Sequence, residues 1–240
     1  MNKFLLILSF ILFQASFLMA GPGGKIAKEV FDSPLGKILA VVLFVVFLPL
    51  ILRMWYRERK AVSATKNKLS KMSGLNYDLF DEINLKNRVT DVFMRVHKAW
   101  SERNLDECDD FMTHWYQQNQ QTVFLDEWDK KGMMNICTIN KINSVKPIHL
   151  RVTDQENYEG SRIMYLINAN MEDYLVSTTN SSIIEGKKGF NDVQTIWTLK
   201  LVEGAWKLDN IDQSEELSTY LKMESQRSDS IIERLVDQKA

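Results

Sequence analysis

The sequence predicts an α+β domain preceded by one transmembrane helix. Its 240 residues allow one globular domain of ordinary size with appendages. Apolar residues are concentrated at the N-terminus, because the first 52 residues carry only six charged side chains and the remaining 188 carry the other 55. Farther along, helical spacing of apolar residues gives way to period-two alternation after Gly132. Helices followed by a run of antiparallel strands are the order of an α+β domain.

The N-terminus has the layout of a secretory signal peptide. An apolar run over residues 4–13 follows Lys3 and precedes small and polar residues up to Ala20. Cleavage after Ala20 would leave Leu18 three residues before the cut, a poor fit to the usual small residue, so an uncleaved anchor is the alternative. We expect a signal peptide or signal anchor over residues 1–20 and a spacer over residues 21–34.

A transmembrane helix is predicted over residues 35–56. No charge occurs from Ile38 to Leu52, and the stretch up to Tyr56 is 19 residues long. At about 1.5 Å per residue, this length nearly matches the roughly 30 Å hydrocarbon layer of a bilayer. A buried core helix is the alternative, but a helix that is apolar all round does not suit the loop and the basic run at its two ends.

Charge assigns the two sides of this helix. Residues 53–71 carry seven basic side chains and one acidic one, whereas residues 72–240 have a net charge of −9. The positive-inside rule then places the C-terminal side in the cytoplasm, whether the first segment is cleaved or remains as half of a hairpin.

We expect residues 57–80 to form a basic juxtamembrane stalk that lies on the anionic leaflet. The attraction amounts to about 1 kcal/mol for each basic residue near the surface. The residues expected at the membrane surface are Arg53, Arg57, Arg59 and Lys60. The alternative is that these charges only set topology.

The same composition disfavours several other functions. The acidic domain lacks the basic face that phosphate binding requires, so nucleic acid is not an expected partner. Cys108 and Cys137 form no CxxC motif, and the chain has only three histidines. We therefore predict no metal site and no cofactor.

Two helices open the domain, which is predicted over residues 81–213. Apolar residues from Val89 to Trp100 follow the spacing of a one-faced helix. Asn104 is placed as the N-cap of a second helix, in which Leu105, Cys108, Met112 and Trp115 repeat at three and four. This helix is expected to run to Trp128, with a break between residues 117 and 122, and to stop at Gly132.

Strands follow the second helix. A short strand is expected over residues 145–152, and long ones over 163–172 and 193–201. Glu203 and Gly204 turn the last of these into a strand over residues 206–211, which forms a hairpin. Residues 179–190 are expected to form a polar loop, with a short extra strand at 182–185. A strongly curved sheet wrapped around the helices would leave a conical cavity. Residues 214–240 are expected to be a short helix and a tail that frays.

The residues now described carry a family resemblance. They are the segment Trp100-Ser101-Glu102-Arg103-Asn104-Leu105-Asp106, the pair Asp173-Tyr174, the strand Ile196-Trp197-Thr198-Leu199 and the strand from Gly204 to Ile211. Over residues 80–213 the chain resembles the C-terminal domain of the mitochondrial import-motor tether, the Tim-forty-four-like family, and its bacterial membrane-anchored relatives. The resemblance implies the cone-shaped nuclear-transport-factor-two-like fold with an apolar pocket, a scaffolding role and a bacterial inner-membrane location. The mitochondrial protein's chaperone-binding region has no counterpart here.

Two interpretations of the pocket stay open beside this one. The favoured interpretation is that the tryptophans Trp100, Trp115, Trp197 and Trp206 fill the core. The alternative is a groove for an apolar peptide or a lipid tail, lined by Phe93, Tyr165, Met171 and Trp197. His97 and Asp173 would form a general acid/base pair only if they met in a dry pocket, and structural roles are favoured for both. His114 and His149 are isolated, and no nucleophile motif or phosphate loop occurs.

The sequence therefore favours a non-enzymatic, membrane-anchored scaffold. Its cytoplasmic domain is expected to bind a membrane-associated protein in translocation or complex assembly. Binding of a small apolar ligand or lipid in the cavity is the alternative, followed by an enzyme that uses His97 and Asp173.

Overall fold

The computed structural model describes residues 33–221 and 226–238 of the chain. The predicted signal segment and all of the spacer up to residue 32 lie outside the described residues. The chain divides into two compact units, Met1–Tyr56 and Arg57–Ala240, and each is described below by itself.

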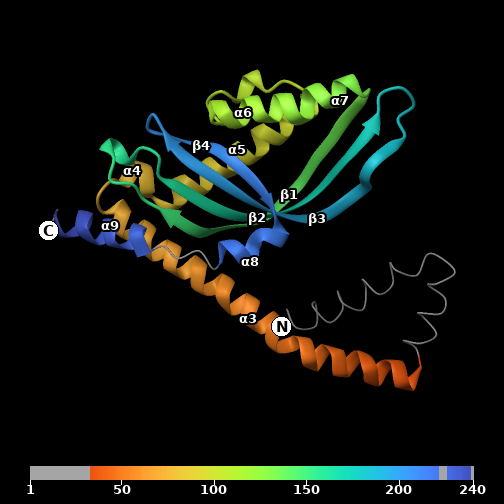
Figure 1. Cartoon of the computed structure of the whole chain (residues 1–240), viewed down its shortest axis with the longest axis horizontal. Helices are drawn as coiled ribbons and strands as arrows, with labels where there is room; N and C mark the ends of the chain where they lie inside the picture. The colour runs from red at the N-terminus through yellow and green to blue at the C-terminus, as the bar shows by residue number, and fades with distance from the viewer. Residues whose placement is uncertain (1–32, 222–225, 239–240) are drawn as a thin grey trace. The chain divides into compact units, whose positions relative to one another are not determined.

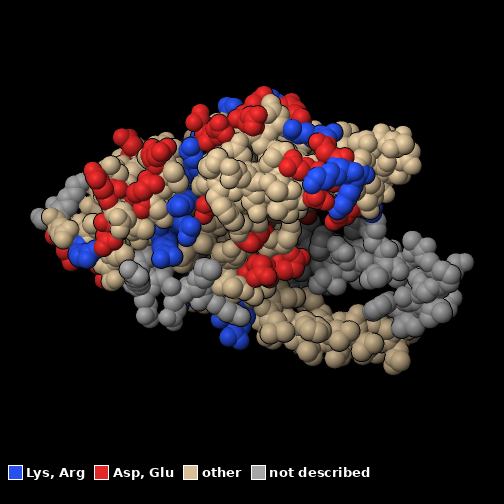
Figure 2. All heavy atoms as spheres, turned by 45° about the horizontal axis from the view of Figure 1, so that its top comes forward, with Lys and Arg blue, Asp and Glu red and all other residues tan. Residues whose placement is uncertain are grey.

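The described part of the N-terminal unit is helical and belongs to α3, Pro34–Ser73 (Figure 1). The Ser33 hydroxyl accepts a hydrogen bond from the Gly36 amide at 3.0 Å, and Pro34 occupies the first helical turn, where its missing amide costs nothing. Within the described residues, α3 is the one helix long and apolar enough to cross a membrane. Its apolar part shows no charged side chains in the space-filling view (Figure 2). The helix predicted over residues 35–56 is confirmed, and helical structure continues through residue 73 of the stalk.

The C-terminal unit begins with the end of α3, where Leu69 and Met72 are fully buried in the core. Two capped helices follow: α4, Tyr77–Phe80, and α5, Glu82–Glu102. The Asp81 carboxylate accepts hydrogen bonds from the amides of Ile83 and Asn84, which satisfies two of the donors at the start of α5. The predicted apolar face of this helix is confirmed, with Val89, Val92, Phe93 and Val96 all buried.

The second predicted helix is different in the structure. The stretch contains η1 (Asp106–Cys108), α6 (His114–Gln120), the π-helix η2 (Gln121–Leu125) and α7 (Asp126–Lys130). Asn104 does not cap a long helix, because the amide of Thr113 donates to Leu208 and the amide of Leu208 donates to Phe111. These bonds pull residues 111–113 onto the sheet, and α6 starts afresh with Thr113 as its cap. Trp115, expected on an apolar stripe, is 65% exposed.

Four antiparallel strands form one sheet in the order β1-β2-β3-β4. They are β1 (Met133–Arg151), β2 (Arg162–Ser177), β3 (Ile183–Val202) and β4 (Ala205–Gln213), with η3 (Glu156–Tyr158) between the first two. β1 begins well before the predicted strand at 145, and its pairing with β2 is interrupted by three register shifts. Such irregularities bend a strand and increase its local twist. The helical segments α5, α6 and α7 lie over one side of the sheet (Figure 1).

The turns that connect β2 to β3 and β3 to β4 can be compared with the sequence predictions. The turn at Glu203-Gly204 is confirmed, since both residues have positive φ angles of 52° and 76°, as a two-residue type I′ hairpin requires. Within the polar loop expected over residues 179–190, the short strand at 182–185 is present as the start of β3, but the loop expected for residues 186–190 is wrong, because β3 continues through them. β3 starts at Ile183, and its first part pairs with the end of β2, with Glu185 opposite Leu175 and Gly186 opposite Tyr174. Backbone pairing along a long partner strand makes this polar stretch a strand despite its composition.

The C-terminal segment is ordered rather than frayed over much of its length. After η4 (Ser214–Glu216) and α8 (Leu217–Tyr220), helix α9 spans Gln226–Asp237. Ile232 on α9 is 2% exposed and belongs to the main core cluster. Asp229 forms a salt bridge with Lys68 of α3, and Arg234 forms one with Asp154. A packed apolar side chain and two ion pairs thus hold a helix that would be marginal by itself.

Candidate functional site

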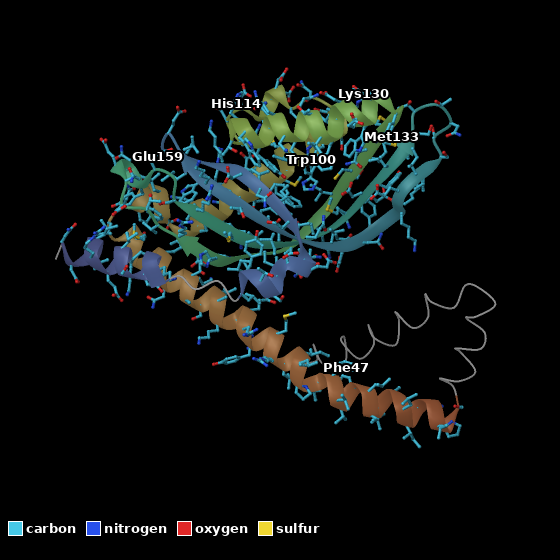
Figure 3. The ribbon with its side chains drawn as sticks, viewed as in Figure 1. Phe47, Trp100, His114, Lys130, Met133 and Glu159 are labelled. Carbon is cyan, nitrogen blue, oxygen red and sulfur yellow. The ribbon has the colours of Figure 1, made fainter. Side chains whose placement is uncertain are left out.

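The main candidate site is a pocket of about 410 Å³ between the sheet and the helical segments α5, α6, η2 and α7. Phe124 at this pocket is 39% exposed, whereas Trp197 is 1% exposed, so the pocket extends from the surface to the core. Figure 3 labels Trp100, one of the two α5 residues in the lining. The lining consists of His97, Trp100, Tyr116, Gln120, Phe124, Trp128, Asn135, Met171, Asp173, Tyr174, Leu175, Glu185, Gly186, Val193, Thr195, Trp197, Ile211 and Gln213.

The four residues predicted to line a groove separate into two pairs. Met171 and Trp197 line the pocket. Phe93 and Tyr165 do not; each is 1% exposed within the core. The Phe93 ring packs against Trp197 with centroids 4.9 Å apart, so it contacts the lining residue Trp197 without lining the pocket itself. The Tyr165 hydroxyl is buried and has no hydrogen-bond partner among the described residues.

His97 is held in one orientation and one tautomer. Its Nδ1 lies 2.8 Å from the carbonyl oxygen of Phe93, and a carbonyl can only accept, so Nδ1 carries the proton. Nε2 is then a lone-pair acceptor. The ring packs against Phe93, Trp100 and Trp197, with centroids 4.3 to 5.4 Å away. Burial lowers the pKa of His97 to about 4, against the raising effect of the Phe93 carbonyl, so the imidazole is neutral at physiological pH.

Asp173 faces the same pocket from β2. The residue is exposed overall, yet its carboxyl lies where desolvation raises its pKa, while a hydrogen bond with Asn135 acts in the opposite direction and the charge of Glu185 raises it further. Asn135 is itself 6% exposed and comes from β1, which pairs with β2. The structure therefore places His97 and Asp173 at one pocket, on α5 and β2 respectively.

Several lining residues were not predicted. Tyr116, Phe124 and Trp128 come from the stretch in which the sequence indicated one long helix with a break. Phe124 in the π-helix η2 lies near Trp128 in α7, with ring centroids 5.8 Å apart, and π-helical segments are frequent at functional sites. Glu185 was expected at the end of a short extra strand within a polar loop, and only the long pairing of β2 with β3 brings it to the pocket. The i, i+4 spacing of Phe124 and Trp128 was the available signal.

The four residues expected at a membrane surface lie on α3. Arg53 belongs to the N-terminal unit; Arg57, Arg59 and Lys60 begin the C-terminal unit, with Arg57 half-buried and the other two exposed. Other charges of the predicted stalk contact the domain itself. Lys66 pairs with Glu82, and Glu58 pairs with Lys146 of β1. The later part of the stalk is therefore a component of the folded domain.

Among the described residues, no group of three or more His, Cys, Asp or Glu side chains is arranged to hold a metal ion. Cys108 and Cys137 are both free thiols, and burial raises the pKa of each, to about 11 for Cys108 and about 12 for Cys137. Such thiols are poor nucleophiles at neutral pH.

Comparison with known proteins gives little beyond this geometry. No protein-family model matches the chain, and no curated protein matches its sequence. Among solved structures, the chain is similar to the intermembrane space region of the chloroplast protein ARC6. The TM-score is 0.39 at 10% sequence identity, over 55% of this chain and 95% of that one. A similarity of this extent carries no argument about family or function.

Proposed function

We propose that this chain is a membrane-anchored interaction module whose domain binds a segment of a membrane-associated partner protein in the pocket beneath α6, η2 and α7. One observation carries the proposal. A pocket of about 410 Å³, large enough for a side chain or a small ligand, runs from the partly exposed Phe124 to the buried Trp197. Aromatic side chains in such a position are typical anchors of protein recognition.

Anchoring supports this role. The apolar part of α3 is long enough to span a bilayer, and a tethered domain meets other membrane proteins at a high effective concentration. A modest affinity in the pocket is then sufficient. The basic residues after the apolar run favour a cytoplasmic domain, with Arg53, Arg57, Arg59 and Lys60 on the anionic leaflet. A bacterial inner membrane is what the family resemblance implies. The Tim-forty-four-like resemblance and the cone-shaped nuclear-transport-factor-two-like fold belong to this proposal.

Binding of an apolar ligand or a lipid tail is the second candidate. Met171, Leu175 and Val193 give the pocket an apolar wall that favours it. Asp173 and Glu185 are less suited to a fatty acid, because their charges would repel its carboxylate. Catalysis is the third and weakest reading. A His97 imidazole whose pKa is about 4 is a weak general base at neutral pH.

Site-specific photocrosslinking in intact membranes tests the proposal. A photoreactive phenylalanine at Phe124 samples the pocket, and the same residue at Tyr77 is the matched control, since Tyr77 is 61% exposed on α4 and does not line the pocket. We expect a discrete protein adduct from position 124 and none from position 77. Lipid adducts alone would favour the second candidate, and equal adducts at both positions would contradict a pocket-specific partner.

A further inference from the structure

The charge of the pocket lining is one-sided. Two carboxylate side chains, Asp173 and Glu185, take part in it, whereas no lysine or arginine does among the described residues. The two carboxylates are close enough that the charge of Glu185 acts on Asp173. Lys187 is paired in register with Asp173 on the adjacent strand, but it is not one of the residues that line the pocket. Two negative charges in one pocket repel each other, and a positively charged ligand group would offset this repulsion.

Six of the other lining residues are aromatic. Trp100, Tyr116, Phe124, Trp128, Tyr174 and Trp197 surround the same space. The faces of aromatic rings carry negative electrostatic potential and attract a cation within about 6 Å of the ring centroid. Aromatic rings combined with carboxylates form a site for an organic cation, whose alkyl part packs on the rings while its charge meets the acids.

The polar atoms of the pocket distinguish between kinds of cation. His97 is 7% exposed, and its Nδ1 proton is used by the Phe93 carbonyl, so Nε2 carries a lone pair that can accept a hydrogen bond. The Trp100 indole N–H, also in the lining, is buried and has no hydrogen-bond partner among the described residues. The Thr195 hydroxyl already accepts from the Trp197 indole at 2.9 Å. A ligand with N–H groups would donate to the His97 lone pair, whereas a quaternary ammonium has no proton to donate. The Trp100 N–H needs an acceptor, which a backbone carbonyl beside the cation would supply.

From this geometry we infer that the pocket binds a protonated primary alkylamine, and that its source is a lysine side chain of the partner. The four-carbon stem would lie along the tryptophan rings, and the ammonium would donate to Asp173, Glu185 and His97 Nε2. This inference rests on the proposed function and names the chemistry of the partner segment. A free small amine has the same chemistry, and the experiment below separates the two sources.

Binding of amines to the full-length protein in lipid nanodiscs is the direct test. The probe is n-butylammonium, which reproduces a lysine side chain, and n-butanol and butyrate are its neutral and anionic counterparts. The tryptophans of the pocket report occupancy through their fluorescence. We expect a saturable change with n-butylammonium, at least tenfold weaker binding of n-butanol, and none of butyrate.

Variants locate the binding. Asp173→Asn and Glu185→Gln should each weaken n-butylammonium binding roughly tenfold, the effect of losing one charge in a partly desolvated site. Glu215→Gln removes the same charge from an exposed position outside the pocket and should leave binding unchanged. Equal binding of n-butylammonium and n-butanol, or equal effects of Glu185→Gln and Glu215→Gln, would overturn the inference.

The source of the amine is settled by combining these variants with the crosslink at Phe124. If the partner supplies a lysine, Asp173→Asn and Glu185→Gln reduce the adduct yield, and replacing one lysine of the crosslinked partner peptide by Met does the same. An adduct that no carboxylate variant affects overturns the lysine inference and leaves the proposed interaction module intact. Amine binding without any protein adduct overturns the lysine source and indicates a free amine, and it counts against the interaction module.

Discussion

His97 shows how a single buried residue links packing to pH. Its imidazole is enclosed by three aromatic rings and bonded to the Phe93 carbonyl, so the folded protein disfavours its protonated form. In the unfolded chain the same imidazole has the ordinary histidine pKa of about 6.5. Between these two pKa values the unfolded state binds more protons than the folded state, and folding stability falls as pH falls through this window.

We therefore expect the free energy of unfolding to decrease as pH falls from about 6.5 to about 4, by roughly 3 kcal/mol from this residue. Urea denaturation at several pH values measures it. His97→Gln should flatten this part of the profile relative to the unmodified protein, while the exposed His114→Gln should not. Parallel profiles for His97→Gln and the unmodified protein would show that His97 does not titrate differently on folding.

Two buried tyrosines differ in whether the hydroxyl has a partner. The Tyr165 hydroxyl has none among the described residues, whereas the Tyr116 hydroxyl is hydrogen-bonded to the backbone of Ile211. Removing an unsatisfied buried hydroxyl is neutral or favourable, but removing a bonded one leaves the other group unpaired. We expect Tyr165→Phe to preserve or raise the free energy of unfolding and Tyr116→Phe to lower it by about 1 kcal/mol. Chemical denaturation of both variants compares them, and a loss of stability in Tyr165→Phe as large as in Tyr116→Phe would contradict this.

At the scale of elements, α9 illustrates how tertiary contacts decide helix formation. Its sequence is short and charged, which favours fraying in isolation. In the folded protein Ile232 enters the core, and the salt bridge between Asp229 and Lys68 joins α9 to α3. Lys68 and most of the core cluster that Ile232 joins are far from residue 232 in the sequence, so no local pattern could show these contacts.

We expect Ile232→Ala to cost about 2 kcal/mol and to expose α9 to proteases, since it removes a buried side chain at the edge of the core. The neighbouring Glu233→Ala is the matched control, because Glu233 is exposed. Limited proteolysis followed by mass spectrometry locates the cuts. If both variants resist cleavage between residues 226 and 238 to the same degree, α9 does not depend on this contact.

For the whole molecule, the apolar part of α3 has the length and composition of a membrane anchor. A charged side chain near the centre of a spanning helix costs about 2.5 to 3.5 kcal/mol. We expect the double variant Val42→Arg and Val46→Arg, on one face of α3, to leave the membrane pellet after alkaline extraction. Asn67→Arg, on an exposed position of the same helix, should stay in it. Retention of the double variant would mean that residues 1–20 supply the anchor.

Three elements of the fold could be predicted from local sequence patterns alone. Apolar length predicted the helical run of α3, one-faced spacing predicted α5, and the Glu203-Gly204 pair predicted the turn between β3 and β4. In each case a short stretch carries its own physical reason: bilayer thickness, helical periodicity or the positive φ angles of a type I′ turn.

The pocket depends on contacts between segments that are distant in the sequence. The start of β3 is polar and becomes a strand because β2 offers it a ladder of backbone partners, which brings Glu185 beside Asp173. The sheet also interrupts the second helix at residues 111–113, and so Trp115 faces solvent while Tyr116 and Phe124 reach the pocket. These placements depend on hydrogen bonds between segments up to about a hundred residues apart, such as Thr113 with Leu208. Local periodicity cannot predict such long-range bonds.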